Sequence, residues 1–414
     1  MAHRITILHT IDPRGGKVGG IETHVRLMLS RHPADVSVLL VGMDERGDLE
    51  IGKPVPVEFD GRRVDFLPVV HIPGDTIHAA AKTVLQSVTL RFTLGVIRHL
   101  LTIRRLAAGD TASTEIERFE LAIPARLIGH PVVQLVHGEG SKGDKMDTIL
   151  ARYWWLYRLN EAIALNLATR VVGVNPNIIA RYEREMPRIA RKSEFMTVSV
   201  DTERFPAAPF PATDVFRVVF AGRLDAFKDP PLMFETLRRL HGKLGGKLEF
   251  HYVGTSDPYR DKEFAGVEAF TIRHGFQTGD GVSAIMRDCH AGILTSYFEG
   301  MPCYLLEALS SGRPVGAIRL PQYDPLIESG VSGFLVERPE DREAAAEQMA
   351  EGFARLAADI FAGKLDPEAI RAKVTPYSVA VQMPKLFERH VALGRTGTAA
   401  RQPGPASPAN SRSH

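Results

Sequence analysis

The stretch from Ala291 to Val315 constrains the fold of this chain more than any other. It reads AGILTSYFEGMPCYLLEALSSGRPV, which predicts a short buried strand, a loop carrying Glu299 and a helix carrying Glu307. Pro302 stands where the first residue of a helix tolerates a missing N–H. A strand, a loop and a helix N-terminus in this order can bind an anion, because unpaired N–H groups and the helix dipole face the end of the strand. The two acids could hold a polyhydroxylated ligand at two places.

Short apolar segments alternate with helical patterns along the whole chain, which predicts an α/β protein built as two doubly wound halves. The first half begins with a strand over residues 4–9, a glycine-rich loop over 15–20 and a helix from Glu22. The proline-rich residues 202–211 are typical of a linker between domains. Further strands are expected over residues 35–41, 131–137, 170–174, 216–221, 248–253, 270–274, 291–295, 313–318 and 333–336.

We therefore expect an N-terminal domain over residues 1–205 and a second domain over 206–375. A helix over 376–392 and a disordered tail rich in Gly, Pro, Ser, Ala and Arg over 393–414 would follow.

The composition excludes several classes of protein. A net charge of +2 over 414 residues produces no overall field that demands nucleic acid. The two cysteines, Cys289 and Cys303, have neither metal-ligand spacing nor the density of a disulfide scaffold, which fits a reducing compartment. The apolar start at residues 5–8 is too short for a signal peptide, and no run of 18 apolar residues occurs. We expect a cytoplasmic protein.

Residues 82–107 form a long helical pattern in which arginines interrupt the apolar positions. Such a basic amphipathic helix can lie on an anionic membrane, which would make the protein peripheral on the inner face. The same pattern fits a domain helix with a solvated basic face. We favour this second interpretation, because runs of charge are usually solvated.

Two cations, Arg223 and Lys228, follow the strand at residues 216–221 in a loop that begins with Gly222. Cations at the carboxyl end of a strand suit a diphosphate, which an arginine can bind through two hydrogen bonds. Taken alone, such a pair would more often be two exposed surface cations, but this loop accompanies the strand, loop and helix around Glu299. The chain contains no G-x-S-x-G, no H-E-x-x-H and no Asp-x-Asp pair that would hold a divalent metal against a sugar diphosphate. We therefore expect no metal and no cofactor.

Two features of the first half are open to more than one interpretation. The glycines of the loop at residues 15–20 could serve only the turn, or could let a ligand approach the backbone. His137 ends a strand beside Gly138, which is a suitable place for a ligand contact. Taken alone, such a histidine is more often a hydrogen-bonded structural residue than a ligand contact.

These segments resemble the retaining glycosyltransferases of the GT-B architecture, in which two Rossmann-like domains face each other across a cleft. Glu299 and Glu307 stand at the E-x7-E positions of that family, and Arg223 and Lys228 at its diphosphate-binding pair. The resemblance is carried by AGRLDAFKD, YVG, SYFEGMPCYLLEALSSGRPVGA and ESGVSGFLV in the second half, and by GGIETH, His137 and VDTERF in the first.

The resemblance implies an enzyme that transfers a sugar from a nucleoside diphosphate to a saccharide or lipid-linked acceptor. His137 would contact the transferred sugar, Glu299 would orient its hydroxyls, and Glu307 would bind the ribose. The catalytic group would thus comprise Glu299, Arg223, Lys228 and His137, and the donor-binding group Gly19, Gly20, Gly222, Gly300, Met301, Pro302 and Glu307. Retention of anomeric configuration and a role in cell-surface polysaccharide or glycolipid synthesis are further implications.

Two positions depart from the family pattern. The loop at residues 319–325 contains Pro321 where the family has a glycine pair, so its contacts with the donor are an open question. Asp229 follows Lys228 in place of the usual glycine. A non-catalytic protein that binds sugar nucleotides is therefore the alternative hypothesis. A dinucleotide-dependent oxidoreductase is disfavoured, because the glycine-rich loop over residues 15–20, which follows the first strand, is not G-x-G-x-x-G.

Overall fold

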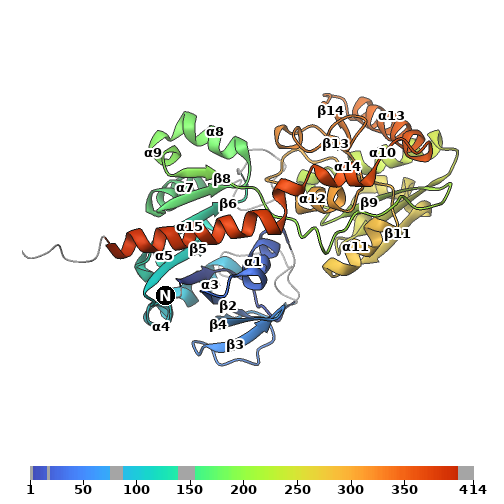
Figure 1. Ribbon diagram of the computed structural model, residues 1–414. Coiled ribbons are helices and arrows are strands. Elements are labelled where there is room, and N and C mark those ends of the chain that lie inside the picture. The colour runs from blue at the N-terminus through green and yellow to red at the C-terminus, as the bar shows by residue number, and fades with distance from the viewer. Residues whose placement is uncertain (1–2, 16–18, 75–86, 139–153, 400–414) are drawn as a thin grey trace, which may run out of the picture. The chain divides into compact units, whose positions relative to one another are not determined.

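The computed structural model describes residues 3–15, 19–74, 87–138 and 154–399 (Figure 1). The chain forms two compact units, and each contains a largely parallel β-sheet flanked by helices. The first unit comprises Met1–Leu135, Leu159–Val172 and Met383–His414, and the second comprises Val136–Arg158 and Gly173–Gln382. The predicted α/β class is confirmed.

The first sheet has eight strands in the order β3-β4-β2-β1-β5-β6-β7-β8. The central strand β1 pairs in parallel with β2 on one side and β5 on the other, so the direction of winding changes beside it. At the edge, β3 and β4 form a hairpin through Asp60 and Gly61, both at positive φ, as a tight two-residue turn requires. The strands are β1 (His3–Leu8), β2 (Val36–Asp44), β3 (Val55–Phe59), β4 (Arg62–His71), β5 (Thr111–Ile116), β6 (Val132–Val136), β7 (Arg170–Gly173) and β8 (Ser193–Phe195).

The predicted helix over residues 82–107 is wrong in one respect, since the described part of it forms two helices. α3 ends at Arg98, and His99 leaves the helical conformation with φ −99° and ψ 13° before α4 begins at Leu100. Residues 82–86 lie outside the described residues. The helices between the first strands and up to β8 are α1 (Gly20–Arg31), α3 (Val88–Arg98), α4 (Leu100–Leu106), α5 (Ala122–Ile128), α7 (Trp154–Leu167), α8 (Pro176–Glu185) and α9 (Pro187–Ala190).

Strand β5 is absent from the sequence-based prediction because its residues are polar, yet Ser113 and Glu115 are completely buried. The Oε2 atom of Glu115 lies 2.7 Å from Nε2 of His390, and its Oε1 atom lies 3.3 Å from Nε2 of His24. Nδ1 of His390 lies 2.8 Å from the Ser113 hydroxyl. Burial alone would raise the pKa of Glu115, but hydrogen bonds with both histidines lower it below its ordinary value. Polar side chains are thus buried because partners from distant helices satisfy them.

The second sheet has six parallel strands in the order β11-β10-β9-β12-β13-β14. Its first strand in the chain, β9, is central, and the following strands are added on one side and then on the other. Buried Phe216, Val218 and Phe220 of β9 anchor a hydrophobic core beneath the helices. The strands are β9 (Phe216–Ala221), β10 (Leu248–Val253), β11 (Thr271–Gly275), β12 (Ala291–Leu294), β13 (Val315–Ile318) and β14 (Gly333–Val336), and the helices are α10 (Pro230–Lys243), α11 (Gly279–Arg287), α12 (Cys303–Ser310), α13 (Arg342–Phe361) and α14 (Pro367–Ala372).

The last helix, α15 (Val379–Ala399), passes the residue at which the sequence predicts a disordered tail to begin. Its residues from Met383 onward belong to the first unit, where His390 makes the contacts with β5 described above. Residues 400–414 lie outside the described residues. None of the helices in the described part of the chain combines the length and apolar character needed to cross a membrane.

Candidate active site

The predicted site residues of the second unit gather where its sheet changes its direction of winding. β9 and β12 are neighbours in the sheet but not in the chain, and both run parallel. Their carboxyl ends therefore open into two loops, residues 222–229 after β9 and 295–302 after β12. In open α/β sheets, the crevice at such a point is where ligands bind.

The central contact of this site joins the two loops through Lys228 and Glu299. The Nζ atom of Lys228 lies 2.7 Å from Oε1 of Glu299, and only 15% and 10% of the two side chains are exposed. The Ser296 hydroxyl donates a hydrogen bond of 2.9 Å to the same oxygen. The Lys228 ammonium also lies 5.3 Å from the centre of the Phe227 ring. A cation and a carboxylate are thus held side by side in a partly desolvated place, where both act more strongly than in water.

Two amide side chains that sequence reasoning missed hold the backbone beside Glu299. Nε2 of Gln322 donates to the Glu299 carbonyl at 2.9 Å, and Nδ2 of Asn175 donates to the Gly300 carbonyl at 3.0 Å. Gln322 lies in a short 3₁₀ turn, Pro321–Tyr323, which is the loop that departs from the family pattern. This loop therefore contributes to the site through a side chain. No spacing or motif in the sequence signals such a contact.

Gly300 is required by a close approach of the backbone. A Cβ atom at this position would lie 1.8 Å from the carbonyl oxygen of His137. The structure therefore brings the backbone of His137 against the loop that carries Glu299, within the second unit. Glu139 and Gly140, which follow His137, lie outside the described residues.

Arg223 and Lys228, predicted as a pair of cations, have separate carboxylate partners in the described structure. The Arg223 side chain is 69% exposed and lies 2.9 Å from Asp225. Gly222 has φ +149°, and its N–H donates to the Val253 carbonyl at 2.8 Å, which turns the chain out of β9. Arg223 is thus far more exposed than Lys228, although both belong to the same loop.

Helix α12 begins one residue later than predicted, since Pro302 is its N-cap and Cys303 its first residue. Met301 is nearly buried before it. Glu307 lies on this helix, and burial raises its pKa to about 7, while the positive charge of Arg204 acts in the opposite direction. The acid that the resemblance assigns to the ribose is therefore poised between its neutral and charged forms near neutral pH.

Gly19 and Gly20 lie in the first unit, where Gly19 is the N-cap of α1 and Gly20 begins it. Gly16, Lys17 and Val18 of the same loop lie outside the described residues. A Cβ atom on Gly19 would come within 2.4 Å of the Glu22 carboxylate, so the side chain of the first turn already occupies this side of the glycine.

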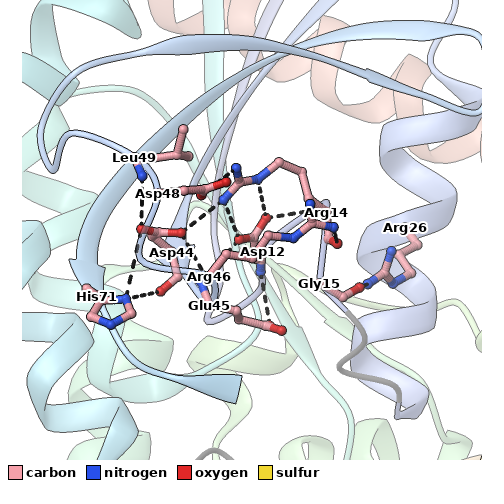
Figure 2. A network of polar contacts seen from close by, with 10 residues as sticks. All are labelled: Asp12, Arg14, Gly15, Arg26, Asp44, Glu45, Arg46, Asp48, Leu49 and His71. Atoms are coloured by element: carbon pink, nitrogen blue, oxygen red, sulfur yellow. Dashed lines mark hydrogen bonds and ion pairs between the residues drawn. The ribbon is translucent and has the colours of Figure 1, made fainter. Parts of the chain in front are cut away.

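A network of ions that the sequence analysis missed holds the chain before these glycines (Figure 2). The guanidinium of Arg14 contacts three carboxylates at the ends of β1 and β2. Asp12 lies after β1 at 2.9 Å, Asp44 is the last residue of β2 at 2.9 Å, and Asp48 lies after β2 at 2.8 Å. The Asp12 and Asp44 side chains are completely buried. The Arg26 side chain binds the Gly15 carbonyl at 2.7 Å. The start of the loop is therefore fixed by ion pairs within the first unit.

One group of residues has the composition of a metal site. Single ligand atoms of His24, Glu115 and Glu117 all lie within 4.8 Å of one another in the first unit. Both carboxylate oxygens of Glu115 already bind histidine nitrogens, from His24 and His390. The group is therefore explained as the buried hydrogen-bond network that joins α1, β5 and α15.

Residues 215–355, which span β9 to α13, match the sequence model of the family described as glycosyl transferases group 1. The chain carries a group 1 glycosyltransferase domain. The UDP-Gal:alpha-D-GlcNAc-diphosphoundecaprenol alpha-1,3-galactosyltransferase of Escherichia coli is 25% identical over 232 residues, which is 52% of this chain and 58% of that protein.

Solved structures extend the likeness of this glycosyltransferase fold to nearly the whole chain. Sucrose-phosphate synthase from Thermosynechococcus elongatus superposes with a TM-score of 0.72 at 15% identity, over 94% of this chain and 99% of that one. Anabaena HepE in complex with UDP and glucose gives 0.64 at 15% identity, over 93% and 98%. The lipopolysaccharide outer core galactosyltransferase WaaB gives 0.59 at 15%, over 94% and 99%. These likenesses confirm the predicted GT-B fold class.

Proposed function

We propose that this chain is a retaining glycosyltransferase that moves a sugar from a nucleoside diphosphate to an acceptor. The observation that carries the proposal is the Lys228–Glu299 pair at the carboxyl ends of β9 and β12. In this proposal, Lys228 stabilises the negative charge that the leaving diphosphate gains, and Glu299 orients the hydroxyls of the transferred sugar. No cofactor is needed for this chemistry, since lysine, arginine and helix N–H groups supply the stabilising charge.

The leaving phosphate is proposed to accept the proton of the attacking acceptor hydroxyl on the same face of the sugar. Glu299 then orients the sugar and does not attack it. Glycosidases also use two carboxylates, but their chemistry has no need of cations beside the acids. Lys228 and Arg223 therefore favour transfer from a diphosphate over hydrolysis.

The names of the similar proteins indicate which substrates to propose first. The Escherichia coli relative is named for UDP-galactose and a diphosphoundecaprenol-linked GlcNAc acceptor, and HepE is described with UDP and glucose. We propose a UDP-hexose donor and a lipid-linked saccharide acceptor, in the assembly of a cell-surface polysaccharide or glycolipid.

The test is to incubate the purified chain with UDP-glucose or UDP-galactose and a diphosphate-lipid-linked GlcNAc, and to determine the anomeric configuration of the product by NMR. Glu299→Ala and Arg223→Ala should each lower the rate by on the order of a hundredfold, as for loss of an electrostatic contact in the transition state. Lys262→Ala, at an exposed lysine of the same unit, is the control. Binding of UDP without any product would instead favour the non-catalytic alternative.

We also propose that α3 and α4 touch an anionic membrane surface, where a lipid-linked acceptor would be found. Leu94, Ile97 and Leu101 are 55%, 51% and 79% exposed, although they are large and apolar. Arg98, Arg104 and Arg105 are exposed on the same two helices, which contain no acidic residue. Exposed apolar side chains bordered by arginines are typical of helices that lie in the interface of a bilayer.

Sedimentation with vesicles of anionic phospholipid tests this contact. We expect the protein to pellet at low salt, and the triple variant Leu94→Gln, Ile97→Gln, Leu101→Gln to remain in the supernatant. Ile272→Gln, at a residue of the second unit that is 40% exposed, is the matched control. Failure of the wild-type protein to pellet at low salt would overturn the proposal.

A further inference from the structure

The residue after Lys228 has a backbone conformation that an aspartate rarely adopts. Asp229 has φ 50° and ψ 60°, in the left-handed region that glycine enters without steric cost. Asp60 is the other non-glycine residue with positive φ in the described structure. Asp60 stands in an exposed hairpin turn, whereas Asp229 is buried, so specific contacts must hold Asp229 in place.

Arg338, which follows β14, supplies these contacts. Its Nη1 atom lies 2.7 Å from Oδ2 of Asp229, whose side chain is only 3% exposed. Asp229 precedes α10 as its N-cap, yet its side chain makes no capping hydrogen bond. An aspartate at an N-cap usually binds the N–H groups of the first turn. Here the carboxylate is directed to Arg338 instead.

Arg338 also binds the loop that carries Glu299. Its Nη2 atom donates to the Thr295 carbonyl, and its guanidinium lies 3.8 Å from the centre of the Tyr297 ring. The Thr295 hydroxyl in turn donates to the Lys228 carbonyl at 2.7 Å, and the Tyr297 N–H donates to the Phe227 carbonyl at 2.8 Å. Arg338 therefore stands where the Lys228 loop and the Glu299 loop are joined.

We propose that Arg338 is a positioning residue, which holds the left-handed turn at Asp229 so that Lys228 is presented to the diphosphate beside Glu299. This inference rests on the proposed function, since it assigns Lys228 to the leaving group. Without Arg338, the buried Asp229 carboxylate loses its cation and the unfavourable turn loses its support. The backbone of Lys228 then relaxes, and the distance between Lys228 and Glu299 is no longer maintained.

The test is whether glycine at position 229 makes Arg338 dispensable. Arg338→Ala should lower kcat by about tenfold or more with a smaller change in KM for the donor, because Lys228 acts mainly on the charge that develops in the transition state. Adding Asp229→Gly to Arg338→Ala removes the buried carboxylate, and glycine adopts the positive φ without steric cost. The double variant should therefore recover most of the lost kcat. Arg338→Lys, which keeps one charge, should fall between wild type and Arg338→Ala.

Two controls separate positioning from general effects. Asp60→Gly makes the same exchange at the other positive-φ aspartate and should not rescue Arg338→Ala. Arg342→Ala removes a nearby arginine whose Nη1 atom lies 3.8 Å from Glu263, and should have little effect on kcat. A double variant as slow as Arg338→Ala, or an Arg338→Ala variant as fast as wild type, would overturn the inference.

The thermal unfolding temperature provides a second readout that needs no activity. Asp229→Gly should raise the unfolding temperature of Arg338→Ala more than that of wild type, because only the former lacks the ion pair. If the wild-type protein transfers no sugar, the proposed function is rejected. In that case, the comparison of unfolding temperatures would still decide whether Arg338 supports the turn, and equal shifts in the two backgrounds would reject it.

Discussion

The loops that follow β1 and β9 have the same topology, but their cations are paired with carboxylates to different extents. Both connect a central parallel strand to a helix, β1 to α1 in the first unit and β9 to α10 in the second. After β1, the guanidinium of Arg14 is surrounded by three carboxylates. After β9, Lys228 has one carboxylate partner, Glu299, and Arg223 is largely exposed.

The difference shows that a cation beside a helix start is not by itself an anion site. Hydrogen bonds with Asp12 are the largest effect on Arg14 and raise its pKa above its already high ordinary value, although burial opposes them. Its donors are directed to the carboxylates, so the guanidinium serves to fix the loop. In the second unit each of the two cations has one carboxylate partner, Glu299 for Lys228 and Asp225 for Arg223, and the Arg223 side chain is largely exposed. An added anion would therefore displace fewer contacts there than around Arg14.

The largest effect is expected from breaking the network of the first unit. Arg14→Met leaves the buried Asp12 and Asp44 carboxylates without their cation, which should lower the free energy of unfolding by about 3 kcal/mol or more. Chemical denaturation followed by circular dichroism measures the change. Arg63→Met, at an exposed arginine of β4, is the control. Equal stability of the two variants would show that the network does not hold the loop.

The corresponding change in the second unit should affect turnover more than stability. Lys228→Met should lower kcat/KM for the donor by about a hundredfold, or about 2.7 kcal/mol of transition-state stabilisation. The free energy of unfolding should fall by less than in Arg14→Met, because Lys228 has one carboxylate partner, which also accepts a hydrogen bond from Ser296, whereas Arg14 is paired with two completely buried carboxylates. Steady-state kinetics and denaturation of the same preparation measure both. A Lys228→Met protein that is strongly destabilised but keeps its activity would contradict the comparison.

A smaller effect is expected at Glu307, whose pKa burial raises to about 7 from an ordinary value of 4.5. The folded protein holds a proton that the unfolded chain releases between these values, so stability falls as pH rises from about 4.5 to about 7 and stays low above. Glu307→Gln, which stays neutral, should therefore match wild type near pH 4.5 and be more stable at pH 8, by roughly 1 to 3 kcal/mol. Thermal unfolding across this pH range measures the difference, and a pH-independent difference would reject it.

The smallest effect is expected from an amide contact. Gln322→Ala removes the hydrogen bond to the Glu299 carbonyl, and should lower kcat by about threefold to tenfold, as for a neutral hydrogen bond worth about 1 kcal/mol. Because both partners are uncharged, the ratio of wild-type to variant kcat should not change between low and high salt. A strong salt dependence of this ratio would show that Gln322 acts on the ion pair itself. Initial-rate assays at two salt concentrations measure it.

Much of the fold follows from local patterns. Apolar strands such as β1, β9 and β12 were predictable because their runs of Ile, Val, Leu and Phe are bounded by loop residues. β5 was not, because its polar residues become buried only when histidines from α1 and α15 reach them. The break at His99 within the long basic helix also lies outside what an apolar pattern indicates.

The site residues likewise fall into those that the sequence indicates and those that it does not. Glu299 and Lys228 belong to loops whose positions after strands can be inferred from the chain, and the carboxyl ends of parallel strands necessarily share one edge of the sheet. Gln322, Asn175 and Arg338 are distant from both loops in sequence, and no spacing links them to Glu299 or Asp229. Whether Arg223 and Lys228 touch the same ligand is likewise decided by side-chain directions.

The sequence by itself determined two alternating α/β halves and the stretch around Glu299 in which an anion site begins, because hydrophobic periodicity and turn residues act locally. Only the tertiary structure decided that Arg14 is held by carboxylates whereas Lys228 faces Glu299, and that the buried Asp229 carboxylate is paired with Arg338. The physical reason is that these ion pairs depend on which charged residues, tens of positions apart in the sequence, the fold brings into contact. Burial then makes each such pairing costly to break.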